Sequence, residues 1–281
     1  MKNIIAVLTF SLSGCFAHAK ESAYHGSTPA HMAVREFLNI SRTDSIDFIR
    51  WKLVLNGGRF ELNCSYGLCE PGTPGFSNEK KVSFSGTFKR QDHIYELRHG
   101  NDVYFIKEIN FNLIHLLDKN KALLQGNGGW SYTLNNVSPA PTKQFHFAAA
   151  QKKRDHILIF EGRTPCQPLS QLVGRQTSNA CNKLKWYLIL YSDPASGKPS
   201  HYLIGGTQYR KETMHKGKWD IITSQDGRIT YRLDPEKNEK AIHLLTADNT
   251  ILLFTDPDGS ALVGNEDFSY TLSRTVDHEK H

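Results

Sequence analysis

The chain has 281 residues and a mass of 31.8 kDa, enough for one large domain or two domains of ordinary size. Hydrophobic residues make up 39% and charged residues 22%, which excludes a disordered, collagen-like or coiled-coil protein. The net charge is +6 and the basic residues are scattered, so we expect no nucleic-acid binding. A continuous apolar run occurs only at the N-terminus and is short for a bilayer span, which excludes a multi-pass membrane protein.

The N-terminus has the features of an export signal. Lys2 precedes the apolar run Ile4 to Phe10, and Ala17-His18-Ala19 places small residues where a signal peptidase cuts. This order predicts a signal peptide over residues 1–19. As an alternative, Leu12 to Cys15 fits the lipobox of bacterial lipoproteins, in which Cys15 is lipidated and is the only link to a membrane. Both alternatives export the protein, to the periplasm, the periplasmic face of the outer membrane or the medium.

The cysteine count fits an oxidising compartment. Of five cysteines, four remain once Cys15 is removed or lipidated: Cys64, Cys69, Cys166 and Cys181. Four cysteines allow three pairings, and we favour the local one, Cys64–Cys69 with Cys166–Cys181, because exported proteins keep such pairs oxidised. The alternative is a thiolate site for Cu(I) or Zn(II).

The sequence contains a long internal repeat. Residues 126–134 (GNGGWSYTL) correspond to residues 264–272 (GNEDFSYTL), and Trp51 to Leu55 correspond to Trp186 to Leu190. The two copies are too far apart for a solenoid, so the pattern indicates a duplicated domain.

Each half reads as all-β. Alternation at period two, as in Trp186, Leu188 and Leu190, is typical of strands with one buried face. Turn signals such as Asn56-Gly57-Gly58 and Asp226-Gly227 separate these strands. Because a small open sheet would expose its edges, we predict two tandem antiparallel meander barrels of the lipocalin-like type.

The domain boundaries follow from this pattern. Residues 20–45 are expected to form a flexible N-terminal arm, with a short helical pattern around Ala33 to Leu38. The first β domain is expected over residues 46–137 and the second over residues 156–276. Between them, the Pro-bearing residues 138–155 are predicted to be a linker.

The second half resembles the N-terminal domain of the NlpE copper-resistance lipoproteins of the bacterial envelope. Phe160 to Cys166 (FEGRTPC) resembles the opening strand and loop of that family, Gly217-Lys218-Trp219 its Gly-Thr-Trp step, and Leu262 to Arg274 its closing strand. The resemblance implies a lipocalin-like eight-stranded barrel and a role in envelope homeostasis. The family's Cys-x-x-Cys is absent, since Gln167 to Ser170 follow Cys166.

Three classes of function follow. We expect a non-catalytic envelope protein that acts in envelope stress or copper homeostasis through contacts with envelope proteins or metal, with no resident cofactor. His25, His31 and Met32 on the expected arm are candidate copper ligands, and a solvated arm without metal is the alternative. A second class is a carrier whose barrel encloses a small apolar ligand against tryptophans. The third is an enzyme of unrecognised type, although no catalytic motif occurs and no catalytic residue is assigned.

Overall fold

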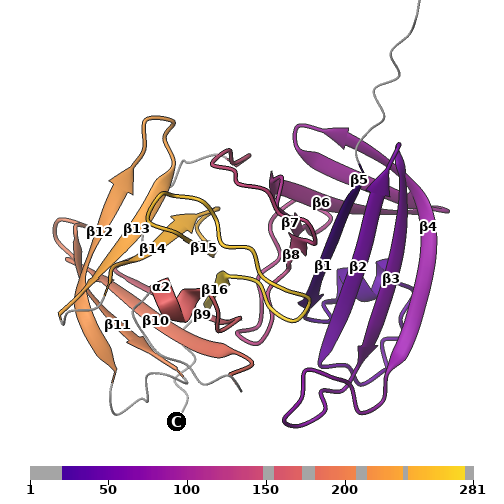
Figure 1. Cartoon of the computed structure of the whole chain (residues 1–281), viewed down its shortest axis with the longest axis horizontal. Helices are drawn as coiled ribbons and strands as arrows, with labels where there is room; N and C mark the ends of the chain where they lie inside the picture. The colour runs from indigo at the N-terminus through magenta and orange to yellow at the C-terminus, as the bar shows by residue number, and fades with distance from the viewer. Residues whose placement is uncertain (1–20, 148–154, 173–180, 207–213, 237–239, 276–281) are drawn as a thin grey trace, which may run out of the picture.

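Two closed antiparallel barrels of eight strands each follow one another along the chain (Figure 1). The structure is a computed structural model, and it describes residues 21–147, 155–172, 181–206, 214–236 and 240–275. The first barrel consists of β1 (Ser22–Thr28), β2 (Phe48–Asn56), β3 (Arg59–Gly67), β4 (Lys80–Gln91), β5 (Ile94–His99), β6 (Asp102–Asn110), β7 (Leu113–Leu116) and β8 (Thr133–Asn136). The second consists of β9 (Ile157–Thr164), β10 (Leu184–Ser192), β11 (Pro199–Gly205), β12 (His215–Thr223), β13 (Ile229–Pro235), β14 (Ile242–Thr246), β15 (Ile251–Thr255) and β16 (Thr271–Thr275).

Each barrel is an up-and-down meander, as the sequence predicted. Neighbouring strands pair in chain order, and the first strand closes the barrel by pairing with the last, β1 with β8 and β9 with β16. Burial alternates along the strands, so that Trp51, Leu53 and Leu55 point inward from β2 and Trp186, Leu188 and Leu190 from β10. Period-two sequences therefore fill both interiors with aromatic and aliphatic side chains. Among the described residues, no helix has the length and hydropathy of a membrane span.

The expected N-terminal arm is a folded part of the first barrel, so that prediction was wrong. Residues 22–28 form β1, which pairs with β2 along its whole length and with β8 at Tyr24 and His25. The helical pattern that follows is confirmed as α1 (Met32–Phe37), whose Phe37 ring stacks on Tyr104 at 4.8 Å. The segment has few large apolar residues, but barrel closure provides partners for its backbone hydrogen bonds.

The duplication is visible in atomic detail. A short helix follows the first strand of each barrel: α1 after β1, and α2 (Leu169–Leu172) after β9. In the first barrel the indole nitrogen of Trp51 donates to Thr28 Oγ1 at 2.8 Å. In the second barrel Trp186 donates to Thr164 Oγ1 at 2.9 Å. The two halves therefore share one architecture, including a buried polar contact.

The barrels meet at an interface with pseudo-two-fold symmetry. Ser131 bonds Ser269 at 2.6 Å and Thr271 bonds Thr133 at 3.2 Å, and the members of each pair are 138 residues apart. The symmetry-related loops also exchange bonds: Gly126 N donates to Ser273 Oγ and Gly264 N donates to Asn135 Oδ1. Contact between equivalent residues is the property of an isologous dimer interface, here contained within one chain.

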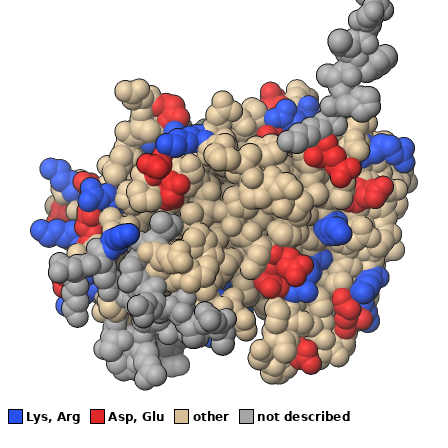
Figure 2. Space-filling view, in the orientation of Figure 1, with Lys and Arg blue, Asp and Glu red and all other residues tan. Residues whose placement is uncertain are grey.

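A separate apolar cluster fills this interface. It joins Ile109 and Leu113 of the first barrel to Leu245, Ile251 and Leu253 of the second. Figure 1 shows the β15–β16 connection extending toward the first barrel. On the face drawn in Figure 2, basic and acidic side chains are interspersed rather than gathered by sign.

The described part of the predicted linker is packed against both barrels. The Asn112 side chain holds Ala140 through two hydrogen bonds, of 2.7 and 2.9 Å. Arg228 of the second barrel donates to Lys143 O at 2.9 Å and lies over the Phe145 ring. Residues 138–147 are therefore part of the interface, and the remainder of the predicted linker includes residues outside the described ranges.

Candidate functional site

Three side chains with metal-binding chemistry converge on the first barrel. His93, Glu108 and His146 place one ligand atom each within 4.8 Å of one another. Two imidazoles and a carboxylate form a donor set that suits divalent transition ions such as Zn(II) and Cu(II). Among the described residues, no other cluster of at least three His, Cys, Asp or Glu side chains has this geometry.

Three different kinds of segment supply these ligands. His93 is in the tight β4–β5 turn, where both Asp92 and His93 have positive φ values of 50° and 60°. Glu108 is near the end of β6, beside an irregularity in the β6–β7 pairing, and its backbone N donates to His93 O at 2.8 Å. His146 is on the segment between the barrels, where its backbone N donates to Ile109 O at 2.8 Å. The backbone therefore holds each of the three positions.

The distances are close to those of a coordinated ion. Glu108 Oε1 is 3.7 Å from His146 Nε2, and Glu108 Oε2 is 3.9 Å from His93 Nδ1. A tetrahedral ion with ligands at about 2.1 Å needs donor atoms roughly 3.4 Å apart. The two histidine rings are stacked with centroids 3.6 Å apart, so both nitrogens can bind one ion only after the ring planes tilt toward each other. The Glu108 side chain is 9% exposed, which limits competition from water.

Arg90 is the direct neighbour of this cluster. Its Nε donates to Glu108 Oε2 at 2.6 Å, and its Nη2 is 3.2 Å from His93 Nδ1. The guanidinium thus neutralises the carboxylate and engages a histidine lone pair that a metal would use. The guanidinium would repel a metal cation, so metal binding requires Arg90 to move away from His93. Arg90 can keep its bond to Glu108 and so continue to orient that carboxylate.

The electrostatic environment keeps His146 available as a ligand. Burial, followed by the neighbouring His93, lowers the pKa of His146 below its usual value. Burial also lowers the pKa of Lys107 on the same strand as Glu108. A neutral imidazole is the form that binds metal.

The structure gives the predicted copper ligands separate positions. His25 is on β1, paired with Lys52 and Asn135, and burial lowers its pKa. His31 is the N-cap of α1, where its Nδ1 accepts a hydrogen bond from Ala33 N at 3.2 Å. Met32 begins that helix and is exposed. The fold engages His25 and His31 in structural contacts, and the arm that was expected to carry the three residues is absent.

One of the two predicted disulfides is confirmed. Cys166 and Cys181 are bonded, with a Cα separation of 6.1 Å. The Cys64–Cys69 pairing was wrong, because both are free cysteines. Cys64 points into the core from β3, and five residues of extended chain span about 16 Å, beyond the reach of a disulfide. Cys15 and the rest of the predicted signal peptide are outside the described residues.

Sequence reasoning missed His93, Glu108 and His146 because no local spacing connects them. They are brought together by a hairpin, a strand end and the return of the inter-barrel segment. The available signals were a histidine in a turn and another between two phenylalanines, and neither identifies a partner.

Comparisons of this chain with protein-family models, with curated proteins and with solved structures found no match.

Proposed function

We propose that this chain is a non-catalytic protein of the bacterial envelope that holds a divalent transition-metal ion at His93, Glu108 and His146. The observation that carries the proposal is the convergence of two imidazoles and a largely buried carboxylate within 4.8 Å. This assignment keeps the metal-homeostasis role expected from the sequence. It moves the proposed site from the N-terminal segment to the β4–β5 turn, the end of β6 and the segment between the barrels. Copper homeostasis is the form of that role suggested by the NlpE resemblance.

Three features support the envelope location. The N-terminal sequence has the order of an export signal. The Cys166–Cys181 disulfide is of the kind that persists in oxidising compartments. The second half resembles an envelope family in the residues of its opening and closing strands. Protein isolated from an envelope fraction should therefore have an intact mass lacking at least residues 1–14, whereas full-length chain in the cytosol would contradict export.

Metal retention is favoured over metal catalysis by the charges around the cluster. A hydrolytic metal site needs an open position beside a general base. Arg90 and Lys107, both cations, lie next to the cluster, and Arg90 is already bonded to Glu108. A ligand inside a barrel is not favoured by any described contact, because core side chains fill both interiors.

Equilibrium dialysis of the purified mature protein against Zn(II) or Cu(II) tests the proposal. We expect one tightly held ion per chain. His93→Ala and His146→Ala should each weaken binding by at least about tenfold, since loss of even an outer-shell partner has that effect. His156→Ala is the matched control, because it removes an exposed histidine away from the cluster.

Arg90→Gln separates a metal site from a structural ion pair. If the cluster binds metal, loss of the guanidinium removes a competitor for Glu108 and His93, and the affinity should rise several-fold. If the cluster is only an Arg90–Glu108 ion pair, the wild type and Arg90→Gln should both release metal as readily as His93→Ala. Equal affinities of the wild type, His93→Ala and His146→Ala would overturn the assignment.

A further inference from the structure

A cavity of about 200 Å³ lies between the two barrels, away from the histidine cluster. Three aromatic rings line it: Phe48, Trp130 and Phe268. Phe48 is stacked between Phe76 and Trp130, with centroid distances of 4.2 and 4.8 Å. This stacking covers both faces of Phe48 and fixes the apolar wall of the cavity in place.

Residues from equivalent positions of the two halves line this cavity, and the two halves differ there. Trp130 and Phe268 occupy equivalent positions in the repeated loops. Phe48 and Lys183 are also equivalent. Each stands three positions before the tryptophan of its half that donates to a threonine hydroxyl, Trp51 or Trp186. All four of the paired residues line the cavity. The duplication has thus placed an ammonium group on the second half where the first half has an aromatic ring.

Among the described residues, Lys183 forms no direct ion pair, although the Asp267 carboxylate of the same cavity attracts its charge. Its Nζ makes no hydrogen bond or ion pair with the described residues, and it lies 5.8 Å from the centroid of the Phe268 ring. Burial, followed by repulsion from Arg163, lowers the pKa of Lys183. A partly buried ammonium beside an apolar wall is stabilised by an anion that replaces its lost hydration.

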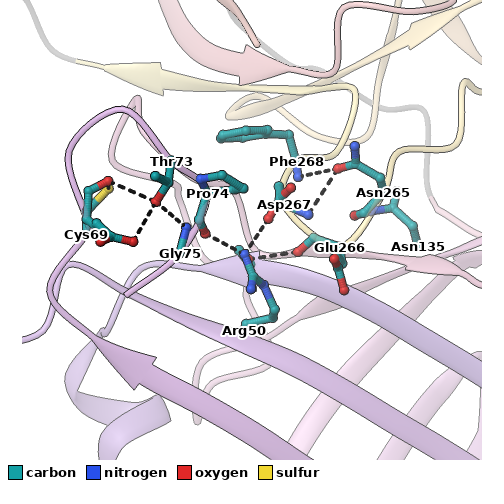
Figure 3. A network of polar contacts seen from close by, with 12 residues as sticks. Arg50, Cys69, Thr73, Pro74, Gly75, Asn135, Asn265, Glu266, Asp267 and Phe268 are labelled. Carbon is teal, nitrogen blue, oxygen red and sulfur yellow. Dashed lines mark hydrogen bonds and ion pairs between the residues drawn. The ribbon is translucent and has the colours of Figure 1, made fainter. Parts of the chain in front are cut away.

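The acidic residue of the cavity is already paired with another cation. Asp267 forms an ion pair with Arg50, and Arg50 also donates to Pro74 O at 2.7 Å. Figure 3 shows Arg50 between the loop at Thr73 to Gly75 and the loop at Glu266 to Phe268. Arg50 thus fixes both loops and holds Asp267 in an ion pair, whereas Lys183 has no ion pair among the described residues.

We propose that this cavity binds a small organic monoanion, a carboxylate on an aromatic body, with the carboxylate on Lys183 and the body against the aromatic side chains that line the cavity. The cavity volume limits the body to about one ring. Inorganic phosphate has no apolar surface to pack against the aromatic lining, so it is not the expected ligand. This site is independent of the metal proposal, because it shares no residue with the histidine cluster.

The thiol of Cys69 provides a reporter inside the cavity. Cys69 lines it and is partly exposed, whereas Cys64 is buried and Cys166 and Cys181 are bonded to each other. In a Cys15→Ser background, a thiol reagent should therefore label the folded chain at Cys69. A bound ligand should slow this reaction by covering the thiol.

The test measures the labelling rate of Cys69 with and without benzoate. We expect saturating benzoate to slow labelling several-fold, while neutral benzamide and inorganic phosphate leave the rate unchanged. Lys183→Gln should abolish the protection. Lys185→Gln is the matched control, because Lys185 is an exposed lysine two positions further along the same segment, and it should keep the protection.

Each rate is expressed relative to the same variant without ligand, so an altered basal reactivity of Cys69 does not affect the result. Thermal melting confirms that each variant is folded. No protection of the wild type by benzoate would overturn the proposal. Equal protection by benzamide, or protection retained in Lys183→Gln, would also overturn it, because the anion would then not be recognised.

Discussion

His115 is a fully buried imidazole whose two ring nitrogens are both hydrogen bonded. Nε2 lies 2.8 Å from Leu124 O and Nδ1 lies 2.9 Å from Thr133 Oγ1. Since a carbonyl only accepts, Nε2 carries the proton and Nδ1 accepts from the hydroxyl. Burial lowers the pKa of His115 to about 4. The second barrel has Leu253 at the equivalent position. Leu253 comes 138 residues after His115, the same separation as in the interface pair Thr133 and Thr271.

This histidine should make the folded state sensitive to acid. An unfolded histidine has a pKa of about 6.5, so between that value and the folded value the unfolded chain binds the extra proton. The contribution is therefore fully present above about pH 6.5 and is lost as the pH falls through about 4, by about 3 kcal/mol in total. Urea unfolding at a series of pH values measures it.

His115→Leu, which installs the residue of the second half, should flatten the pH dependence over that range. The variant leaves Leu124 O without its donor and the hydroxyl proton of Thr133 without its acceptor, so it should be about 1 kcal/mol less stable at neutral pH. His156→Leu, at an exposed histidine, should keep the wild-type slope. An unchanged slope in His115→Leu would show that other groups cause the acid sensitivity.

The disulfide is the second feature at the residue scale. Cys166 and Cys181 close a loop with a sequence separation of 15 between β9 and β10. Replacing both with Ser should lower the free energy of unfolding by about 3 kcal/mol, because the open loop gains conformational freedom in the unfolded chain. Chemical denaturation of the variant, and of the wild type with reductant, measures the loss.

Cys69→Ser provides the comparison for that experiment. Cys69 forms no disulfide and is partly exposed, so its replacement should change stability by less than about 0.5 kcal/mol. A reductant effect that is equally large in the wild type and in the Cys166→Ser, Cys181→Ser variant would contradict this disulfide assignment.

At the scale of the elements, a glycine in the first strand of each half permits barrel closure. A Cβ at Gly26 of β1 would lie 2.9 Å from Leu134 Cδ2 of β8, a side-chain atom. A Cβ at Gly162 of β9 would lie 2.6 Å from the backbone oxygen of Thr271 in β16. A side chain can rotate away, but a paired backbone oxygen cannot move without breaking the closure.

Gly162→Ala should therefore destabilise the protein more than Gly26→Ala. We expect a loss of about 1–3 kcal/mol for Gly162→Ala, the range for overpacking at a tight contact, and a smaller loss for Gly26→Ala. Thermal and denaturant unfolding of the two single variants measure the difference. The reverse order would mean that the β9–β16 seam adapts more readily than the β1–β8 seam.

Strands with a clear apolar alternation were predicted from the sequence, and strands without it were not. Trp51, Leu53 and Leu55 have a clear period of two because one face of β2 packs in the core. Residues 22–28 have a weaker pattern, in which Gly26 and Thr28 occupy buried positions without large side chains. A strand that depends on close backbone approach and a buried hydroxyl lacks an apolar signal, so β1 was predicted as a flexible arm.

At the scale of the whole molecule, the chain is an intramolecular pseudo-dimer. The contacts Ser131–Ser269 and Thr133–Thr271 join equivalent residues across the interface. The repeat in the sequence revealed the two barrels, but it could not reveal that they pack through their closing strands. The interface depends on which copies of the repeated residues contact each other, and that information is not local.

The two barrels should remain associated after the chain between them is cut. A specific protease site inserted within residues 148–154 should give two fragments that co-elute and unfold in one transition, because the interface includes an apolar cluster and reciprocal hydrogen bonds. Size-exclusion chromatography and calorimetry measure this. Thr133→Arg combined with Thr271→Arg should separate the fragments, since two buried like charges would face each other.

Thr223→Arg is the control for that variant. Thr223 is exposed at the end of β12, so the substitution adds a charge away from the interface. The cut fragments of Thr223→Arg should still co-elute. Fragments of the cut wild type that separate spontaneously would show that the two barrels are independent domains.

The cluster of His93, Glu108 and His146 shows the limit of sequence reasoning most clearly. His93 is in the β4–β5 turn and Glu108 is on β6, and His146 joins them only because residues 138–147 return along the interface. A linker prediction gave no reason to connect His146 with the β4–β5 turn. The cluster therefore depends on the packing of the whole molecule, although each ligand is an ordinary residue in its local sequence.

Electron paramagnetic resonance of the protein loaded with one equivalent of Cu(II) tests the metal assignment most directly. The wild type should show nitrogen couplings from two imidazoles, and His146→Ala should show the coupling of one, with His156→Ala identical to the wild type. Arg90→Gln should keep both couplings and hold the ion more tightly. Identical spectra for the wild type, His93→Ala and His146→Ala would contradict the assignment, because the copper would then be bound elsewhere.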